Sequence, residues 1–373
     1  SRVTDKMLAD TYERRFESHP LYSHLWGIRR NIREIYDSTS GSRDARHQKI
    51  ARLKEKAAEL EFQINESLFS EARVIACTLT GSASHLLFAK RFGTLFIDEA
   101  AQALEASCWI AAQKADRIIL AGDHRQLPPT IKCPEAQEGG LDHTLMQQIV
   151  ENKPRCVSLL TVQYRMCEGI MQFPNQQFYE GKLTSDPSVK YRSILDWDTP
   201  IEWIDACDEL QETDVLQDET FAEEVSLDGV SRVNPAEAQL TLDTLHRYFE
   251  KIGKERILYE RIDVGLISPY KGQVRLLRRL IKKDSYWKPF RHLITINTVD
   301  GFQGQERDIV VISMVRSNKD GQVGFLRDLR RMNVALTRAR MKLILIGNRE
   351  TLCRHPFYHS LEKYVRHLEE WEN

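Results

Sequence analysis

Two neighbouring carboxylates, Asp98 and Glu99, directly follow a short apolar run at residues 94–97. At the end of a buried strand, a first carboxylate can hold Mg²⁺ through water, and a second can orient or deprotonate an attacking water. Acidic residues also favour the first turn of a helix, so the pair alone is only a weak indication of a nucleotide site.

A rigid loop and a fixed arginine, both suited to phosphoryl transfer, follow later apolar runs. Residues 122–129 read GDHRQLPP, and their glycine and prolines favour a tight loop that could hold Gln126 beside a γ-phosphate. Residues 163–166 read QYRM, where Arg165 could neutralise charge on a transferring phosphoryl group and Tyr164 could stack on adenine. Alone, the loop would be better explained as a structural turn.

Two further segments offer contacts to a nucleotide. Residues 298–306 read TVDGFQGQE, in which glycines such as Gly304 allow close backbone approach and Glu306 could accept hydrogen bonds from ribose hydroxyls. Residues 333–340 read NVALTRAR, in which Arg338 is a second candidate arginine finger and Arg340 its alternative.

These five segments, in chain order DEAAQ, GDHRQLPP, QYRM, TVDGFQGQE and NVALTRAR, resemble motifs II to VI of the superfamily 1 helicases. The residues within these motifs are similar to those of the branch that contains the nonsense-mediated-decay helicase, the immunoglobulin-mu-binding-protein helicase and senataxin. The resemblance covers residues from about 73 to 350. It implies two RecA-like lobes around an ATP cleft, with single-stranded nucleic acid across them.

The resemblance also implies a role for each motif residue, with ATP and Mg²⁺ as cofactors. Asp98 would bind Mg²⁺, Glu99 the attacking water and Gln126 the γ-phosphate. The two arginine fingers would be Arg165 and Arg338. The remaining ATP contacts would be Tyr164, Gly304, Glu306 and Arg340.

Contacts to single-stranded DNA or RNA are expected at three places. The segment CTLTGS at residues 77–82 resembles motif Ib, and small residues such as Thr80 and Gly81 let a phosphate approach backbone N–H groups. Further candidates are Pro269 with Tyr270, and Thr298 with Val299. The residues do not distinguish DNA from RNA.

The sequence departs from the family at the phosphate-binding loop GxxxxGK[ST], which is absent. Gly181-Lys182 precedes Leu183, and Gly253-Lys254 precedes Glu255. In the family this loop lies upstream of the region matched here. We therefore expect this chain to be the C-terminal part of a helicase whose missing N-terminal segment acts as a partner.

The leading functional hypothesis is that the chain is part of an ATP-dependent DNA or RNA helicase or translocase. By itself, the chain is expected to be inactive. The alternative is a non-hydrolysing nucleic-acid-binding fragment, or half of a split motor. A nuclease is disfavoured because no acidic and lysine cluster appears beyond Asp98 and Glu99.

Alternation of short apolar runs with helical stretches must position these residues, and it predicts an α/β fold with parallel sheets. The expected strands are 74–79, 94–97, 118–121, 157–162, 264–268, 293–298, 309–315 and 343–347. The expected helices are 103–113, 167–179, 236–252, 270–283 and 357–371. A capping box is expected where Asn234 precedes Pro235 and Glu237.

Apolar residues three and four apart at 21–36 and 50–64 predict two helices, each with one narrow apolar seam along one side. A loop at 38–42 would join them. They would form an antiparallel hairpin, either purely structural or, by family resemblance, a helical insertion of the first lobe. The expected domains are this hairpin at 1–70, a partial first RecA-like lobe at 71–155 and a second RecA-like lobe at 156–373. The acidic stretch 208–232 is expected to be a surface loop.

Composition limits the alternatives. The chain has 53 basic and 54 acidic residues and a net charge of −1, so any nucleic-acid surface must be a local basic patch. No apolar run of about 18 residues or secretory leader is found, which indicates a non-membrane protein of the cytoplasm, or of a nucleus if the source has one. The 7 cysteines show no metal-binding spacing.

Overall fold

The computed structural model describes residues 9–37, 42–206, 222–226, 229 and 231–371. The chain divides into two compact units, one of residues 1–95 with 106–119 and one of residues 96–105 with 120–373. Most of the predicted loops at 38–42 and 208–232 lie outside the described residues. The predicted domain boundaries after residues 70 and 155 stay predictions.

In the described part of the first unit, the first full helices are α2 (Tyr12–Ser18), α3 (Tyr22–Asp37) and α4 (Arg43–Glu71). Helices α3 and α4 pack side by side, with Leu25 and Ile64 fully buried between them and Ala57 nearly so. An ion pair of 2.6 Å joins Arg29 of α3 to Glu61 of α4 on the exposed side. The narrow apolar seam expected from the sequence therefore holds these helices together.

The segment after α4 contains the one clear error in the predicted strands of this unit. Residues 74–79 form no strand, and the side chain of Val74 is 86% exposed. A strand needs a hydrogen-bonded neighbour, and among the described residues none pairs with this stretch. Two short 3₁₀ turns follow, η1 (Thr80–Ala83) and η2 (His85–Leu87).

A small two-stranded sheet comes next, formed by β1 (Leu95–Ile97) and β2 (Ile118–Leu120). The strands are linked by η3 (Ala100–Gln102) and α5 (Glu105–Ala112). Both strands and the helix were expected, each slightly longer than observed. The elements that follow are α6 (Pro134–Glu138), α7 (Leu145–Asn152) and η4 (Pro154–Cys156).

The second unit is built on a five-stranded sheet of order β5-β11-β10-β8-β9. Its strands are β5 (Ile201–Asp205), β8 (Val264–Ser268), β9 (Ile294–Thr298), β10 (Arg307–Ser313) and β11 (Ala339–Gly347). Every neighbouring pair in this sheet is parallel. The carboxyl ends of its strands therefore meet at one edge, where ligands bind in sheets of this kind.

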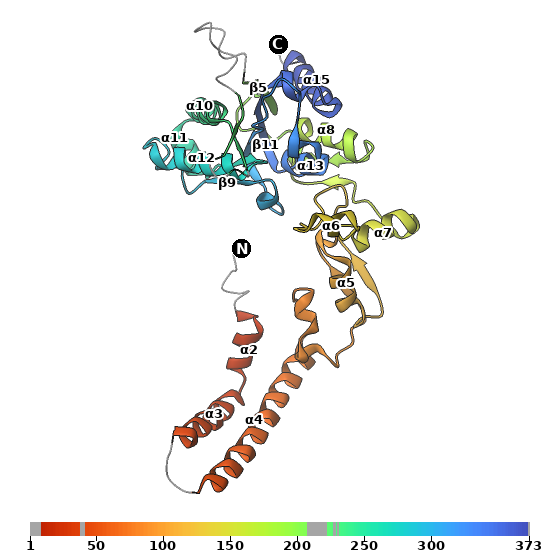
Figure 1. Ribbon diagram of the computed structural model, residues 1–373, viewed down its shortest axis with the longest axis vertical. Helices are drawn as coiled ribbons and strands as arrows, with labels where there is room; N and C mark the ends of the chain where they lie inside the picture. The colour runs from red at the N-terminus through yellow and green to blue at the C-terminus, as the bar shows by residue number, and fades with distance from the viewer. Residues whose placement is uncertain (1–8, 38–41, 207–221, 227–228, 230, 372–373) are drawn as a thin grey trace. The chain divides into compact units, whose positions relative to one another are not determined.

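Helices cover both faces of this sheet. Figure 1 shows α10 (Pro235–Ile252), α11 (Lys254–Glu260) and α12 (Lys271–Lys283) on one side, and α8 (Glu168–Phe178), α13 (Leu329–Leu336) and α15 (Pro356–Trp371) on the other. The two cores divide alternate residues of one strand. Ile309 and Val311 of β10 belong to the α10 side, whereas Val310 and Ile312 belong to the α8 side. Burial on both faces explains why these strands are continuous apolar runs.

The remaining elements are short. They are β3 (Val162–Gln163), β4 (Thr184–Ser185), α9 (Pro187–Lys190), β6 (Glu224–Val225), β7 (Arg232–Val233), η6 (Asp300–Phe302), η7 (Gly324–Arg327) and α14 (Arg349–Leu352). The strand expected at 157–162 is wrong, because only Val162 and Gln163 pair, with β4. Leu160 is 87% exposed, so this apolar run is not a core strand. No helix of the described part is both long and apolar enough to cross a membrane.

The start of α10 confirms half of the expected capping box. The side chain of Asn234 accepts a hydrogen bond of 3.0 Å from the N–H of Glu237. The reciprocal bond is absent, because the carboxylate of Glu237 instead accepts from Ser313 Oγ at 2.6 Å and from the N–H of Val315 at 2.7 Å. The Asn234 N–H is satisfied by Gln273.

Candidate functional site

The two carboxylates after β1 point away from the core. Both Asp98 and Glu99 are exposed, while the preceding Ile97 is buried. Asp98 Oδ1 accepts a hydrogen bond of 3.0 Å from the N–H of Glu99, and Gln102 donates to the Glu99 carboxylate. Glu99 has φ 53° and ψ 37°, a left-handed conformation that is unusual for a residue with a side chain. Such local strain is common at functional sites.

The loop after β2 is tied to this turn through its glycine. A Cβ atom at Gly122 would lie 3.0 Å from the backbone nitrogen of Ala100, so only glycine fits there without a shift. Asp123 then holds the loop with both carboxylate oxygens. Its Oδ1 accepts from the N–H of Arg125 at 2.9 Å, and its Oδ2 accepts from Gln126 Nε2 at 2.9 Å. The orientation of Gln126 is therefore fixed by a neighbour in its own loop.

Arg338, which follows α13, reaches the same glutamine from the second unit's core. Only 2% of Arg338 is exposed. Its guanidinium donates to the carbonyls of Val334 at 3.0 Å and Gln305 at 3.1 Å, and to Gln126 Oε1 at 3.3 Å. Burial and the positive charge of Arg165 lower the pKa of Arg338 to about 10, and the carboxylate of Glu99 opposes that shift. Arg338 thus stays charged near neutral pH, and its pKa depends on the charges of both Arg165 and Glu99.

Glu306 joins two further arginines of the predicted site. Its Oε2 lies 2.6 Å from Arg165 Nε, and its Oε1 lies 2.9 Å from Arg340 Nη2. Burial alone would raise the pKa of Glu306, but the hydrogen bonds from Arg165 and Arg340 outweigh it and lower that pKa. Both carboxylate oxygens are engaged in this structure, so a ribose contact by Glu306 stays a prediction.

Two other predicted ATP contacts stand apart from this cluster. The side chain of Tyr164 is 66% exposed, which leaves its ring face open for stacking. Gly304 has φ 72° and open space where a Cβ would lie. Both features are compatible with a close ligand, and both roles stay predictions.

Two of the four predicted nucleic-acid residues of the second unit are buried. Tyr270 is 3% exposed and Val299 is 2% exposed, so any contact by either would have to use the backbone, and both roles stay predictions. Val299 packs into the core on the α8 side, and the hydroxyl of Tyr270 accepts from the N–H of Phe325 at 3.4 Å. Pro269 and Thr298 are half-buried, so a contact through the backbone remains the prediction there.

In the first unit, Thr80 is exposed and Gly81 is half-buried in the turn η1. The N–H of Gly81 donates 3.0 Å to Thr78 Oγ1, and a Cβ at Gly81 would lie 2.9 Å from that same atom. A side chain at position 81 would therefore have to displace the side chain of Thr78. The role of Gly81 as a phosphate contact stays a prediction.

Sequence reasoning did not identify Tyr179 and Asn333, which link the Asp123 loop to α13. Tyr179 donates to Asp123 Oδ2 at 2.5 Å, and Asn333 donates to the Tyr179 hydroxyl at 2.9 Å. Asp123 and Asn333 lie 56 and 154 residues from Tyr179 along the chain. No local spacing could have indicated such contacts.

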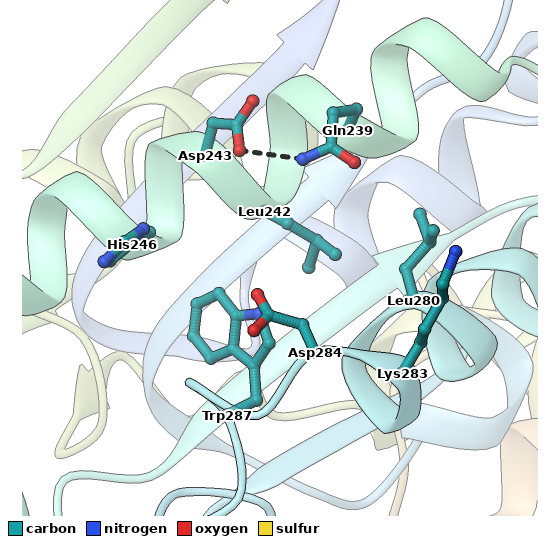
Figure 2. A pocket seen from close by; sticks show the side chains of 8 residues that line it. All are labelled: Gln239, Leu242, Asp243, His246, Leu280, Lys283, Asp284 and Trp287. Carbon is teal, nitrogen blue, oxygen red and sulfur yellow. Dashed lines mark hydrogen bonds between the residues drawn. The ribbon is translucent and has the colours of Figure 1, made fainter.

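Two surface cavities lie away from these residues. One of about 290 Å³ lies between α10, the end of α12 and the following turn, where Figure 2 shows Leu242 between the polar side chains of α10 and Trp287 with Asp284. The second, of about 450 Å³, is lined by Arg278, Arg279, Lys282 and Lys283 of α12. Neither contains a predicted site residue.

Known proteins match most of the chain. An AAA domain family matches residues 141–350, and a second AAA domain family matches residues 27–134. An uncharacterized ATP-dependent helicase of Methanocaldococcus jannaschii is 38% identical over 326 residues, covering 87% of this chain and 46% of the relative. The DNA-binding protein SMUBP-2 of Mesocricetus auratus is 36% identical over 354 residues, covering 90% of this chain and 34% of the relative.

A third relative is the Regulator of nonsense transcripts 1 homolog of Neurospora crassa. It is 34% identical over 311 residues, covering 81% of this chain and 27% of the relative. The chain thus spans about half the length, or less, of these relatives. Among solved structures, the PRRSV helicase is 16% identical, with a TM-score of 0.33 over 69% of this chain and 35% of its own, a likeness too weak to compare sites.

Proposed function

The chain belongs to the superfamily 1 helicases with AAA domains, in the branch represented by SMUBP-2 and the Regulator of nonsense transcripts 1, and from this premise we propose that it carries the hydrolytic half of an ATP-driven motor. The motor would move along single-stranded DNA or RNA. The observation that supports this proposal is the convergence of Gln126, Arg338, Arg165 and Glu306 from four separate segments.

Each of these residues has a definable part in ATP hydrolysis. Asp98 would hold Mg²⁺, since it is an exposed carboxylate at the end of a strand and Mg²⁺ takes one or two carboxylates together with phosphate oxygens. The ion would neutralise charge on the phosphoryl oxygens. Glu99 is exposed beside Asp98 and would accept a proton from the attacking water.

The glutamine and arginines would act on the transferred phosphoryl group. Gln126 is held through its Nε2 by Asp123, which aims its Oε1 toward Arg338. Arg338 and Arg165 would stabilise negative charge as it spreads over the γ-phosphoryl oxygens. In this structure Arg165 is paired with Glu306, so nucleotide binding would exchange this contact for a phosphate contact.

The sequence holds no GxxxxGK[ST], the loop whose N–H groups and lysine cradle the β- and γ-phosphates. Phosphoryl transfer depends almost wholly on positioning and electrostatics, so a site without this cradle should turn over very slowly. We propose that the chain alone binds single-stranded nucleic acid without appreciable hydrolysis. Binding without hydrolysis is also what the alternative function predicts, in which the chain is a non-hydrolysing module or half of a split motor.

The test compares the bare chain with a complemented protein. The complemented protein is this chain supplied with a segment carrying GxxxxGK[ST] from a relative that contains one, fused or as a separate chain. Phosphate release is measured with and without single-stranded DNA or RNA. We expect strand-stimulated turnover from the complemented protein only. Robust stimulated turnover by the bare chain would refute the importance of the loop, and no turnover by either would favour the binding module.

A further inference from the structure

A closed ring of hydrogen bonds joins the Asp123 loop to α13 at two points. On one side, Asn333 Nδ2 donates to the hydroxyl of Tyr179 at 2.9 Å, and that hydroxyl donates to Asp123 Oδ2 at 2.5 Å. On the other side, Arg338 donates to Gln126 Oε1 at 3.3 Å, and Gln126 Nε2 donates to the same Asp123 oxygen at 2.9 Å. Asn333 and Arg338 belong to one short stretch of chain, so the ring closes through α13.

Asn333 strengthens the same connection through the backbone. It is fully buried, and its Nδ2 also donates to the carbonyl of Arg125 at 3.0 Å. Leu127, the next residue but one, is 3% exposed and packs in the core on the α8 side with Met332 and Leu336. The loop that contains Gln126 is therefore seated on α13 by packing, by Asn333 and by the Tyr179 hydroxyl.

The hydroxyl of Tyr179 has a defined polarity in this ring. An ionised carboxylate only accepts hydrogen bonds, so the Tyr179 O–H must donate to Asp123 and its lone pair must accept from Asn333. Burial and the nearby negative charge of Asp123 raise the pKa of the Tyr179 phenol well above its ordinary value. The phenol therefore remains a donor at any working pH.

We propose that Tyr179 is a positioning residue for ATP hydrolysis, which fixes the Asp123 carboxylate so that Gln126 presents its carbonyl oxygen, and not its amide nitrogen, to Arg338. The two ends of a glutamine amide have nearly the same shape, and only hydrogen-bond partners decide between them. Asp123 Oδ2 selects the NH₂ end. If that carboxylate rotates, the NH₂ group can turn toward Arg338, where two donors would face each other. This inference rests on the proposed function.

The variant that isolates the hydroxyl is Tyr179→Phe, which keeps the ring. Its matched control is Tyr364→Phe, because Tyr364 is also half-buried. The hydroxyl of Tyr364 donates a hydrogen bond of 2.7 Å to the carbonyl of Gly169, which is not part of the hydrogen-bonded ring around Asp123. A purely structural role for Tyr179 would give the two variants similar effects.

The first readout uses the bare chain and needs no hydrolysis. The N–H of Arg125 donates to Asp123 Oδ1, so its hydrogen exchange reports how well the carboxylate is held. We expect Tyr179→Phe to raise exchange at Arg125 and Gln126 by about tenfold, the scale of one lost hydrogen bond, while β10 keeps its protection. Tyr364→Phe should leave these amides unchanged. Equal exchange in Tyr179→Phe and the unaltered chain would overturn the proposal.

The second readout uses the complemented protein. Tyr179→Phe should lower kcat for strand-stimulated phosphate release by about tenfold and change KM for ATP less than about twofold, since Tyr179 would act on the transition state through Gln126 and not on ATP binding. Tyr364→Phe should leave both values unchanged. An unaltered kcat in Tyr179→Phe, in a protein that Glu99→Gln inactivates, would overturn the positioning role alone. An unaltered kcat in Glu99→Gln would instead reject the proposed function.

Discussion

The two candidate arginine fingers differ in how much of the fold depends on them. Arg338 is 2% exposed and satisfies two backbone carbonyls, those of Val334 and Gln305. The side chain of Arg165 is 34% exposed, shares Glu306 with Arg340 and donates to one backbone carbonyl, that of Thr337, at 3.2 Å. The first residue is thus part of the core as well as of the site, while the second is mainly part of the site.

This difference predicts separable effects for two substitutions in the complemented protein. Arg338→Ala and Arg165→Ala should each slow turnover by about 10³-fold, the scale known for arginine fingers, and weaken ATP binding much less. Arg338→Ala should also lower the free energy of unfolding by about 1–3 kcal/mol, and more than Arg165→Ala does, because the buried Arg338 satisfies two carbonyls and the more exposed Arg165 satisfies one. Phosphate release and urea unfolding measure the two effects. An equal loss of stability in both variants would contradict the distinction.

At the residue scale, the motif residues were predictable because each motif is local. Asp98 and Glu99 end one apolar run, and Arg338 lies a few residues before another. Tyr179 and Asn333 were not predictable as site residues, because their importance comes from contacts that only the folded chain creates. The burial of Tyr270 and Val299 was missed for the same reason, since a position after a strand does not reveal which way a side chain points.

Among the elements, α10 carries an unusual buried acid in its first turn. Glu237 is fully buried, and its carboxylate accepts from Ser313 and Val315 at the end of β10. Burial raises the pKa of Glu237 to about 7, since the hydrogen bonds it accepts offset only part of the desolvation. The negative charge of the nearby Glu223 contributes to this rise in the pKa of Glu237, although Glu223 is itself paired with Arg316 at 2.9 Å.

This acid predicts a pH dependence of stability with a definite sign. The folded pKa of about 7 exceeds the ordinary value of 4.5, so the folded state binds more protons between these values and stability falls as pH rises through them. At pH 8, Glu237→Gln should therefore unfold at a higher urea concentration than the unaltered chain. The expected gain in the free energy of unfolding is up to about 3 kcal/mol. At pH 5 the difference should shrink to about 1 kcal/mol or less. A pH-independent difference would contradict the assignment.

The strands of the large sheet were predictable because burial on both faces makes them continuous apolar runs, as in β8, β10 and β11. The edge strand β5 was missed, since IEWID mixes polar and apolar residues. The runs at 74–79 and 157–162 were wrongly assigned as strands, because apolar content does not guarantee a neighbour to pair with. Strand pairing depends on the whole sheet and cannot be predicted from the sequence of one segment.

At the scale of the whole molecule, the first unit leaves large apolar side chains exposed. Val74 is 86% exposed and Phe88 is 82% exposed, and Trp109 and Ile119 are about half as exposed, at 47% and 40%. Exposed apolar groups of this kind favour association. We expect the bare chain to self-associate as its concentration rises, and the complemented protein to do so less. Light scattering during size-exclusion chromatography measures this, and a monodisperse bare chain with a single sharp unfolding transition would contradict it.

Nucleic-acid binding should be governed by phosphate contacts. The overall charge of −1 gives no general attraction, so binding must come from local backbone contacts and stacking. For about four phosphate contacts, the logarithm of the association constant should fall with the logarithm of salt concentration with a slope near −3. Fluorescence anisotropy with labelled single strands of different sequence measures this slope. Affinity that depends on sequence but not on salt would exclude this mode of binding.

The central claim is that Asp98, Glu99, Gln126, Arg165 and Arg338 form the catalytic half of an ATPase site. Its most direct test is Glu99→Gln in the complemented protein, with ATP binding and strand-stimulated phosphate release measured side by side. The amide cannot accept the proton of the attacking water. We therefore expect ATP affinity within about threefold of the unaltered protein, with turnover lower by about 10²-fold or more. Turnover that survives Glu99→Gln would show that the active site has been assigned to the wrong residues.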